Sequence, residues 1–381
     1  MKFEERINDS VRDALERRPS DLGAWERFVK RVGRQRTTRY AVTALVGAAA
    51  VAAAIVFVPR LGNDRNVTPI ETPSLTSMPS TTPSPTATPA SVPDEIVAIA
   101  TEGTSNADDR IVVVSTATGN VVRVLAEAKP DAGPHTPSFA PELSLSPDGS
   151  TVYFVRMGEH FGCDEQIVSV PFAGGSEHVV VQGHAPALSP DGRYLAYSGK
   201  GLEPNCQQNP LVVRDLTNGE ERRWTWAAEH PDDPYQGGGA FGLAWAPDSR
   251  HLAFYRNDGD PHWVTSVLDT SQGETLLDAR LVGSQDEGWW APRYLGDGTL
   301  ALLHTVESIH SNPGGRQRVI QVDPSNGNVL SLLAPPAAGV TDLAVDRSGT
   351  FLVYVSTDGV FRVQDGEAIR VTTGAYQAVA W

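Results

Sequence analysis

The stretch LSPDGRYLAY, residues 188–197, is a tight turn followed by an alternating strand, and the chain repeats it. Related stretches are LSPDGSTVYF at 145–154, WAPDSRHLAF at 245–254, LGDGTLAL at 295–302 and VDRSGTFLVY at 345–354. The turns are marked by Asp148, Asp191, Asp248 and Asp297, with Ser348 in the fifth. These marks lie 43, 57, 49 and 51 residues apart, and a unit that recurs at this period predicts a repeat architecture.

Each turn has a local physical cause. Pro190 sets φ near about −65° at the first corner, and the side chain of Asp191 can accept hydrogen bonds from nearby backbone N–H groups. Gly192 supplies the positive φ that the second corner needs. The residues after the turn are rich in Val, Leu, Phe and Tyr, which favour strands.

Four short strands belong to each unit. After the second turn they continue as 194–199, 211–216 and 222–227, and after the third as 251–257, 264–270 and 275–281. Helical periodicity is weak throughout these units. Four antiparallel strands at a period of 40–57 residues are typical of the blade of a β-propeller.

Two incomplete units remain at the ends of the repeat region. Residues 95–100, 110–116 and 120–126 form three strands that lack the first strand of a blade, and AYQAVAW at 375–381 resembles a first strand that lacks the other three. We expect residues 378–381 to pair antiparallel with 95–100. The sequence therefore predicts an all-β, six-bladed propeller that is closed 1+3 by its C-terminal strand, because closure removes exposed sheet edges.

The S-P-D-G turns at 146–149 and 189–192, with A-P-D-S at 246–249, resemble those of the PD40 (WD40-like) or TolB-like family of six-bladed propellers. The resemblance covers about residues 94–381. It implies a module that binds rather than catalyses, since this repeat serves in periplasmic binding proteins and in the non-catalytic propellers of peptidases.

A different organisation precedes the propeller. Residues 1–39 carry two amphipathic helical patterns, and residues 40–58 include eighteen uncharged, mostly apolar positions (41–58) preceded by a cluster of Lys and Arg. We expect an uncleaved membrane helix with the N-terminus in the cytoplasm; the alternative is a cleaved signal peptide. Residues 59–93, rich in Pro, Thr and Ser, predict a disordered tether. This layout resembles that of many actinobacterial membrane proteins, some of them anti-sigma factors.

Charge divides at the same boundary. Residues 1–65 have a net charge of +5, and residues 94–381 have a net charge of −19. An acidic propeller is not expected to bind nucleic acid, which requires neutralisation of phosphates. Neither a G-x-S-x-G elbow nor an H-E-x-x-H pair occurs, and no histidines have ligand spacing, so the sequence predicts no catalytic residues, no metal and no cofactor.

The loops on the face opposite the repeated turns suggest where a protein or peptide ligand would bind. They combine aromatic and acidic residues, a combination that suits a peptide or sugar. The candidate ligand-binding residues are Trp289, Trp290, Tyr235, Asp233, Asp286, Glu287, His184 and Tyr376. The alternative for the tryptophans is that they fill the core around the axis of the ring.

The two cysteines lie in equivalent loops of adjacent units. Cys163 and Cys206 each precede the third strand of a unit, on the extracytoplasmic side of the predicted membrane helix. In an oxidising compartment this placement favours a disulfide; the alternative is two free thiols.

Three functions are consistent with these patterns. The first is a membrane-anchored, extracytoplasmic propeller that acts as a non-catalytic binding or scaffolding module for a protein, peptide or cell-wall ligand. The second is a transmembrane sensor that regulates a cytoplasmic partner through residues 1–39. The third is a propeller enzyme similar to a lactonase or lyase.

Overall fold

The computed structural model describes residues 92–101, 109–128, 139–158, 163–201, 209–225, 239–257, 263–283, 288–305 and 316–381. The chain separates into two units, 1–85 and 86–381, and every described residue belongs to the second. The predicted helices of 1–39, the membrane helix of 40–58 and the tether up to residue 91 lie outside the described residues. Within the ranges above, no helix has the length and apolar character that crossing a membrane requires.

Antiparallel strands make up almost all of the described structure. The first sheet has the order β23-β1-β2-β3, with β1 Glu95–Ala100, β2 Arg110–Ser115, β3 Val121–Glu127 and β23 Tyr376–Ala380. There are three further four-stranded sheets. One contains β11 Phe241–Trp245, β12 His251–Asn257, β13 Trp263–Asp269 and β14 Arg280–Val282, and the next contains β15 Trp289–Tyr294, β16 Leu300–Thr305, β17 Arg316–Val322 and β18 Val329–Ala338. The third contains β19 Asp342–Val345, β20 Leu352–Ser356, β21 Gly359–Gln364 and β22 Glu367–Thr372.

The remaining sheet has seven strands. They are β4 Phe139–Leu145, β5 Thr151–Arg156, β6 Gln166–Pro171, β7 His178–Leu188, β8 Tyr194–Gly199, β9 Leu211–Asp215 and β10 Glu221–Trp224. Residues 178–182 of β7 pair with β6, and residues 183–188 pair with β8. The chain thus passes from one group of four strands to the next without an intervening loop.

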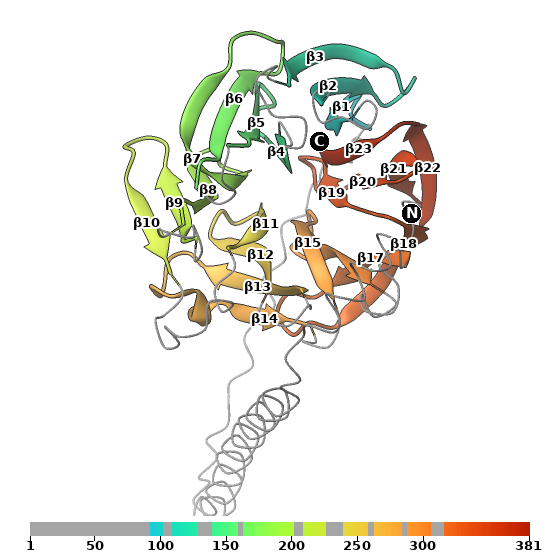
Figure 1. Cartoon of the computed structure of the whole chain (residues 1–381). Coiled ribbons are helices and arrows are strands. Elements are labelled where there is room, and N and C mark those ends of the chain that lie inside the picture. Colours follow the sequence, from blue (N-terminus) through green and yellow to red (C-terminus); the bar gives the residue numbers. More distant parts are fainter. Residues whose placement is uncertain are drawn as a thin grey trace, which may run out of the picture. The chain divides into compact units, whose positions relative to one another are not determined.

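The sheets are arranged around a common axis, with one strand of each group innermost (Figure 1). Contacts between these inner strands run in order from β23 to β4, β7, β11, β15 and β19, and from β19 back to β23. The described residues therefore form an all-β propeller.

The repeated turns have the geometry that their residues predict. Asp191 Oδ1 accepts a hydrogen bond from the backbone N of Arg193 at 3.0 Å, and Gly192 has φ 73°. The acid of the turn makes the same backbone contact at Asp148, Asp248 and Asp297. In the fifth turn the acid moves to the first position, where Asp346 Oδ1 accepts from the backbone N of Phe351 at 2.8 Å. Each turn thus closes through contacts within a few residues.

The pairing of the C-terminal strand with the first strand is confirmed. In register, Val97 pairs with Ala380, Ala98 with Val379 and Ile99 with Ala378. Residues 378–380 of β23 are buried, with Val379 only 1% exposed. Two segments nearly 280 residues apart in sequence therefore share one sheet.

The predicted strand at 275–281 is wrong in its first half. Residues Leu276–Asp278 form a 3-10 turn, and the strand that follows, β14, has only three residues. The physical reason is a capping box: Thr275 Oγ1 accepts from the backbone N of Leu277 at 3.2 Å, and the Asp278 carboxylate accepts from the backbone N of Thr275 at 3.3 Å. These local hydrogen bonds compete with the sheet for the same backbone groups.

The hydrophobic core lies between neighbouring sheets rather than along the axis. One cluster joins β1 and β2 to β4 and β5 through residues such as Ile111 and Phe154, both fully buried. At the edge of this region Cys163 is buried and disulfide-bonded. Cys206 lies outside the described residues, so its pairing with Cys163 stays a prediction.

Candidate functional site

Each inner strand begins on one face of the ring, which we call the loop face, and β4, β7, β11 and β15 end in the repeated turns on the other, the turn face. Near the loop-face ends, polar and aromatic side chains from several sheets meet. We call this set the axial cluster; its members are Glu142, His184, Phe241, Tyr255, Trp263, Trp290, Arg293 and Asp342.

A repeated irregularity of the inner strands shapes this site. Ala185, Gly242 and Ala291 have positive φ values of 55°, 57° and 51°, and each lies six residues before the aspartate of its turn. The pairing of β7, β11 and β15 with the next strand shifts register around these residues. An extra residue in a strand redirects the neighbouring side chains, so these bulges determine what faces the axis.

Carboxylates occupy the corresponding position in two of the three other inner strands. Glu142 in β4 and Asp342 in β19 also lie six residues before their turn marks, Asp148 and Ser348. Because side chains at the same offset in different blades project into the same zone of the ring, both acids are brought toward the axis. The chain thus places acids where the other blades carry small residues.

Glu142 is held by the neighbouring strand β7. Its Oε2 accepts a hydrogen bond from the backbone N of Ala185 at 2.5 Å, and its Oε1 lies 3.6 Å from Nδ1 of His184. The His184 side chain is 3% exposed, and its Nε2 lies 3.5 Å from Nδ2 of Asn209. The carboxylate is therefore fixed by the bulge and by the ring of His184.

Asp342 is held in the same way by β23. Its Oδ2 accepts from the backbone N of Val379 at 3.0 Å, and its Oδ1 is 3.0 Å from Nη2 of Arg293. Burial raises the pKa of the Asp342 carboxyl from 3.8 to about 6, against the opposing effects of Arg293 and the Val379 N–H. The pKa of this carboxyl is thus raised because desolvation outweighs the effect of its partners.

Arg293 joins two sheets across the cluster. Besides its ion pair with Asp342, its Nη1 donates to the backbone carbonyl of Pro292 at 2.8 Å and to that of Gly242 at 3.4 Å. A guanidinium has five N–H donors in a fixed plane, so one side chain can hold three acceptors at once. The arrangement ties β11, β15 and β19 together at the axis.

Aromatic rings form the other part of the axial cluster. Phe241 stacks on His184 with ring centroids 5.2 Å apart and lies 5.8 Å from Tyr255. Tyr255 meets Trp263 edge-on at 5.3 Å and Trp290 at 6.2 Å. Edge-to-face pairs at these distances are favourable beyond the area they bury. Except for His184, these rings are partly exposed, so they offer apolar surface beside the carboxylates.

Tyr255 connects the aromatic and the charged parts. Burial raises the pKa of its hydroxyl, and the carboxylates of Glu142 and Asp342 raise it further. The ring of Tyr255 also explains why residue 242 is a glycine. A Cβ on Gly242 would lie 2.5 Å from Cε1 of Tyr255, closer than real Cβ contacts. Gly242 is therefore needed both for its positive φ and for the approach of this ring.

The predicted site residues differ in their burial and in their neighbours. Trp289 is 3% exposed and packs between the sheet of β11–β14 and the sheet of β15–β18, rather than in a core around the axis. Trp290 is partly exposed and His184 is buried, and both belong to the axial cluster. Tyr376 is partly exposed, and its Oη lies 3.5 Å from Thr372 Oγ1. The remaining candidates lie outside the described residues: Tyr235, Asp233, Asp286 and Glu287.

Several members of the axial cluster were not anticipated. Glu142 and Asp342 carry a signal that the repeat alone contains, since each is an acid at a fixed offset from its turn. Phe241, Tyr255 and Trp263 carry no such signal, because apolar residues at the start of a strand are ordinary core residues.

The chemistry that this geometry supports is recognition. The carboxylates of Glu142 and Asp342 and the guanidinium of Arg293 are engaged in hydrogen bonds that join strands. In the part of the chain that the structure describes, no three His, Cys, Asp or Glu side chains are grouped so that they could hold a metal ion. Partly exposed rings next to fixed charges can bind a peptide segment by stacking and by charge.

No protein-family model and no curated protein matches the sequence. Among solved structures, the chain is similar to TolB from Acinetobacter baumannii, with 15% identity and a TM-score of 0.56 over 76% of this chain and 66% of that one. It thus spans about two thirds of the TolB chain that it matches. A weaker match is a TolB candidate from Agrobacterium tumefaciens, with 17% identity and a TM-score of 0.47 over 67% of this chain and 87% of that one. Another is the periplasmic gluconolactonase of Pseudomonas aeruginosa, with 17% identity and a TM-score of 0.42 over 75% of this chain and 97% of that one. At these identities the likeness shows the propeller fold alone.

Proposed function

We propose that this chain is a membrane-anchored, extracytoplasmic propeller that binds a protein or peptide through the axial cluster without catalysing a reaction. The observation that carries the proposal is the group of partly exposed rings, Phe241, Tyr255, Trp263 and Trp290, beside the fixed carboxylates of Glu142 and Asp342. The likeness in fold to TolB supports a binding role.

A peptide segment is the ligand that these rings and charges suit best. Aromatic anchors that are held in place before binding contribute much of the affinity of a complex, and here bulges and hydrogen bonds between strands hold the rings before any ligand arrives. The net charge of −19 on residues 94–381 favours a ligand with basic residues, because opposite charge speeds encounter.

The proposal includes a complete ring and a membrane attachment. The seven-stranded sheet counts as two blades that share β7, which gives six blades with β23 completing the first. Residues 40–58 span the membrane, 1–39 are cytoplasmic, and the tether displays the propeller outside. Protease added to intact protoplasts should remove the propeller and spare an epitope placed at the N-terminus; the reverse pattern of protection contradicts this topology.

Site-directed photocrosslinking tests the binding site. A photoreactive benzoylphenylalanine replaces Trp290 in the full-length chain in its native cells, and the same probe replaces Gln364, an exposed residue at the turn-face end of β21, as a matched control. We expect a discrete protein adduct from position 290 that is absent from position 364.

A second substitution makes the test specific to the axial cluster. Phe241→Ala removes the ring between His184 and Tyr255, and the adduct from position 290 should then fall at least tenfold while the melting temperature shows that the propeller remains folded. Adducts of equal yield from positions 290 and 364, or a yield that Phe241→Ala leaves unchanged, contradict the proposal.

A further inference from the structure

A cavity opens on the turn face, away from the axial cluster. It lies between β8–β10 on one side and β11–β13 on the other and has a volume of about 460 Å³. This volume is within the range of about 300–1,000 Å³ that small-molecule sites occupy. We call it the turn-face pocket.

Positively and negatively charged side chains line the turn-face pocket in equal number. Three arginines and three acids line it: Arg193, Arg222, Arg250, Asp215, Glu220 and Glu221. Arg193 uses Nε and Nη2 to bind Asp215 at 2.9 and 2.7 Å, and its side chain is 51% exposed. Two of the five donors of Arg193 are used in this pair, so its guanidinium keeps donors for a ligand. The Asp215 oxygens also accept from the backbone N and Oγ1 of Thr217 at 2.8 and 2.5 Å, so their acceptor positions are filled.

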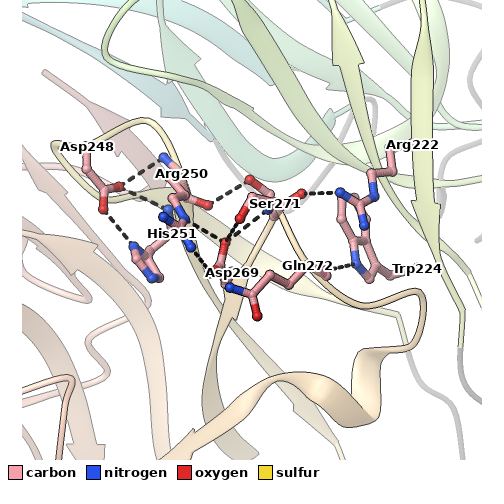
Figure 2. Close-up of polar contacts among 9 residues, drawn as sticks. Arg222, Trp224, Asp248, Arg250, His251, Asp269, Ser271 and Gln272 are labelled. Carbon is pink, nitrogen blue, oxygen red and sulfur yellow. Dashed lines mark hydrogen bonds and ion pairs between the residues drawn. The ribbon is translucent and has the colours of Figure 1, made fainter.

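A second ion pair faces the first across the pocket. Arg250 Nε donates to Asp269 Oδ1 at 2.8 Å, and the Arg250 side chain is 49% exposed. Figure 2 shows this pair in the middle of a continuous series of polar contacts that runs from Asp248 to Trp224. The donors and acceptors are thus held in place before a ligand binds.

Contacts between the sheets keep the pocket open. Arg222 donates to the backbone carbonyls of Thr270 at 2.9 Å and Gly273 at 2.6 Å. Trp224 Nε1 donates to the carbonyl of Gln272 at 3.2 Å (Figure 2). The turn between β13 and β14 is therefore clamped onto β10. A pocket that is fixed in this way loses little entropy on binding.

One wall of the pocket is aromatic. Tyr194 stacks on Trp245 with ring centroids 6.1 Å apart, and the guanidinium of Arg222 lies 4.9 Å from the ring centroid of Trp224. Trp224 and Trp245 are 0% and 6% exposed, so the partly exposed ring of Tyr194 is the aromatic surface that this wall offers to a ligand.

We propose that the turn-face pocket binds a neutral saccharide, of one or two sugar units. Each sugar hydroxyl both donates and accepts a hydrogen bond, so it can accept from the exposed guanidinium groups of Arg193 and Arg250 and donate to the exposed carboxylate of Glu220. The equal number of arginines and acids in the lining disfavours a ligand with net charge, because such a ligand leaves either set unmatched. The C–H surface of the sugar fits against the exposed part of the Tyr194 ring. This site is independent of the axial cluster.

Binding is measured on the full-length chain in a detergent without a sugar head group, since a maltoside would compete. The probes are trehalose and N,N′-diacetylchitobiose, both neutral, with glucose 6-phosphate as the charged comparison. Ligand-observed NMR reports contact, and fluorescence of the tryptophans at the pocket reports saturation. We expect saturable binding of at least one neutral disaccharide, at least fivefold tighter than that of the sugar phosphate.

Three variants locate the site. Glu220→Trp, at an exposed position of the pocket rim, should weaken binding at least tenfold by filling the pocket. Arg193→Lys keeps the charge beside Asp215 but removes the planar fork, and should weaken binding at least threefold. Glu367→Trp, an exposed residue in the corresponding turn of another sheet, should change affinity less than twofold.

Three results would overturn the proposal. Absence of saturable binding by both neutral disaccharides overturns the proposal, as does equal or tighter binding of glucose 6-phosphate. Binding that Glu220→Trp leaves intact, in a variant with the melting temperature of the parent, shows that the saccharide binds elsewhere and also overturns it. Axial-cluster variants such as Phe241→Ala should leave saccharide affinity unchanged, so failure here is distinguishable from failure of the peptide site.

Discussion

Removal of β23 tests whether the ring depends on its last strand. Deletion of residues 375–381 leaves β1 without its inner partner, because Val97, Ala98 and Ile99 pair with this segment. It also removes the buried side chains of Val379, 1% exposed, and Trp381, 7% exposed. We expect the deletion to abolish cooperative folding of the propeller.

The magnitude follows from burial. Loss of a buried valine costs about 1.5–3 kcal/mol, and loss of a buried tryptophan side chain costs about 3–5 kcal/mol. Asp342 loses the N–H of Val379, and an unsatisfied buried acceptor costs about 1–3 kcal/mol. Together these losses approach the whole stability of a typical domain, about 5–15 kcal/mol.

A graded version keeps the result interpretable. Val379→Ala should lower the free energy of unfolding by about 1.5–3 kcal/mol, measured by urea unfolding of the full-length chain. Val329→Ala is the same chemical change on β18 at a residue that is 54% exposed, and it should cost less than about 0.5 kcal/mol. A deletion variant that melts like the parent, or equal costs for the two valines, would refute the reasoning.

Three further predictions concern single positions. Asp342 has a folded-state pKa of about 6 against 3.8 for the ordinary group, so the protonated form favours folding and its contribution is lost as pH rises from about 4 to 6. The free energy of unfolding of the parent, compared with that of Asp342→Asn, should therefore fall by about 3 kcal/mol across that range. If the difference between the two proteins does not change with pH, the raised pKa is contradicted. Gly242→Ala should cost about 2–4 kcal/mol, because it combines a positive φ with a contact at 2.5 Å to the Tyr255 ring, and thermal melting checks it. Replacing both Cys163 and Cys206 by Ala should lower stability by about 3–4 kcal/mol if they pair, and treatment with a reductant should then leave the double variant unchanged while it lowers the melting temperature of the parent.

Some features could be predicted from the sequence because their causes act over a few residues. Asp191 and Gly192 close their turn through contacts within the turn itself, and the same is true of Asp148 with its neighbours. The failed strand at 275–281 has an equally local cause, a capping box between Thr275 and Asp278. The signal was present there, but the strand pattern of the repeat outweighed it in our prediction.

The pairing of β23 with β1 was also predictable, although the two strands are far apart in sequence. Three strands without a first strand at 95–126 and a first strand without the others at 375–381 have one simple arrangement that leaves no edge unpaired. The repeat supplies this long-range information, since every unit between the two ends shows what is missing from each.

By itself, the sequence determined the all-β repeat, its turns and the segments that close it, because turn chemistry and strand alternation are local. Only the tertiary structure decided which side chains meet at the axis. Trp289 and Trp290 are adjacent on β15, yet the first is buried in the core and the second is partly exposed in the axial cluster, because successive strand residues face opposite sides and a bulge between Trp290 and Arg293 sets the register. Asp342 meets Arg293 and Val379 for a similar reason: closing the ring brings inner strands from different sheets to one axis, and no local pattern records that contact.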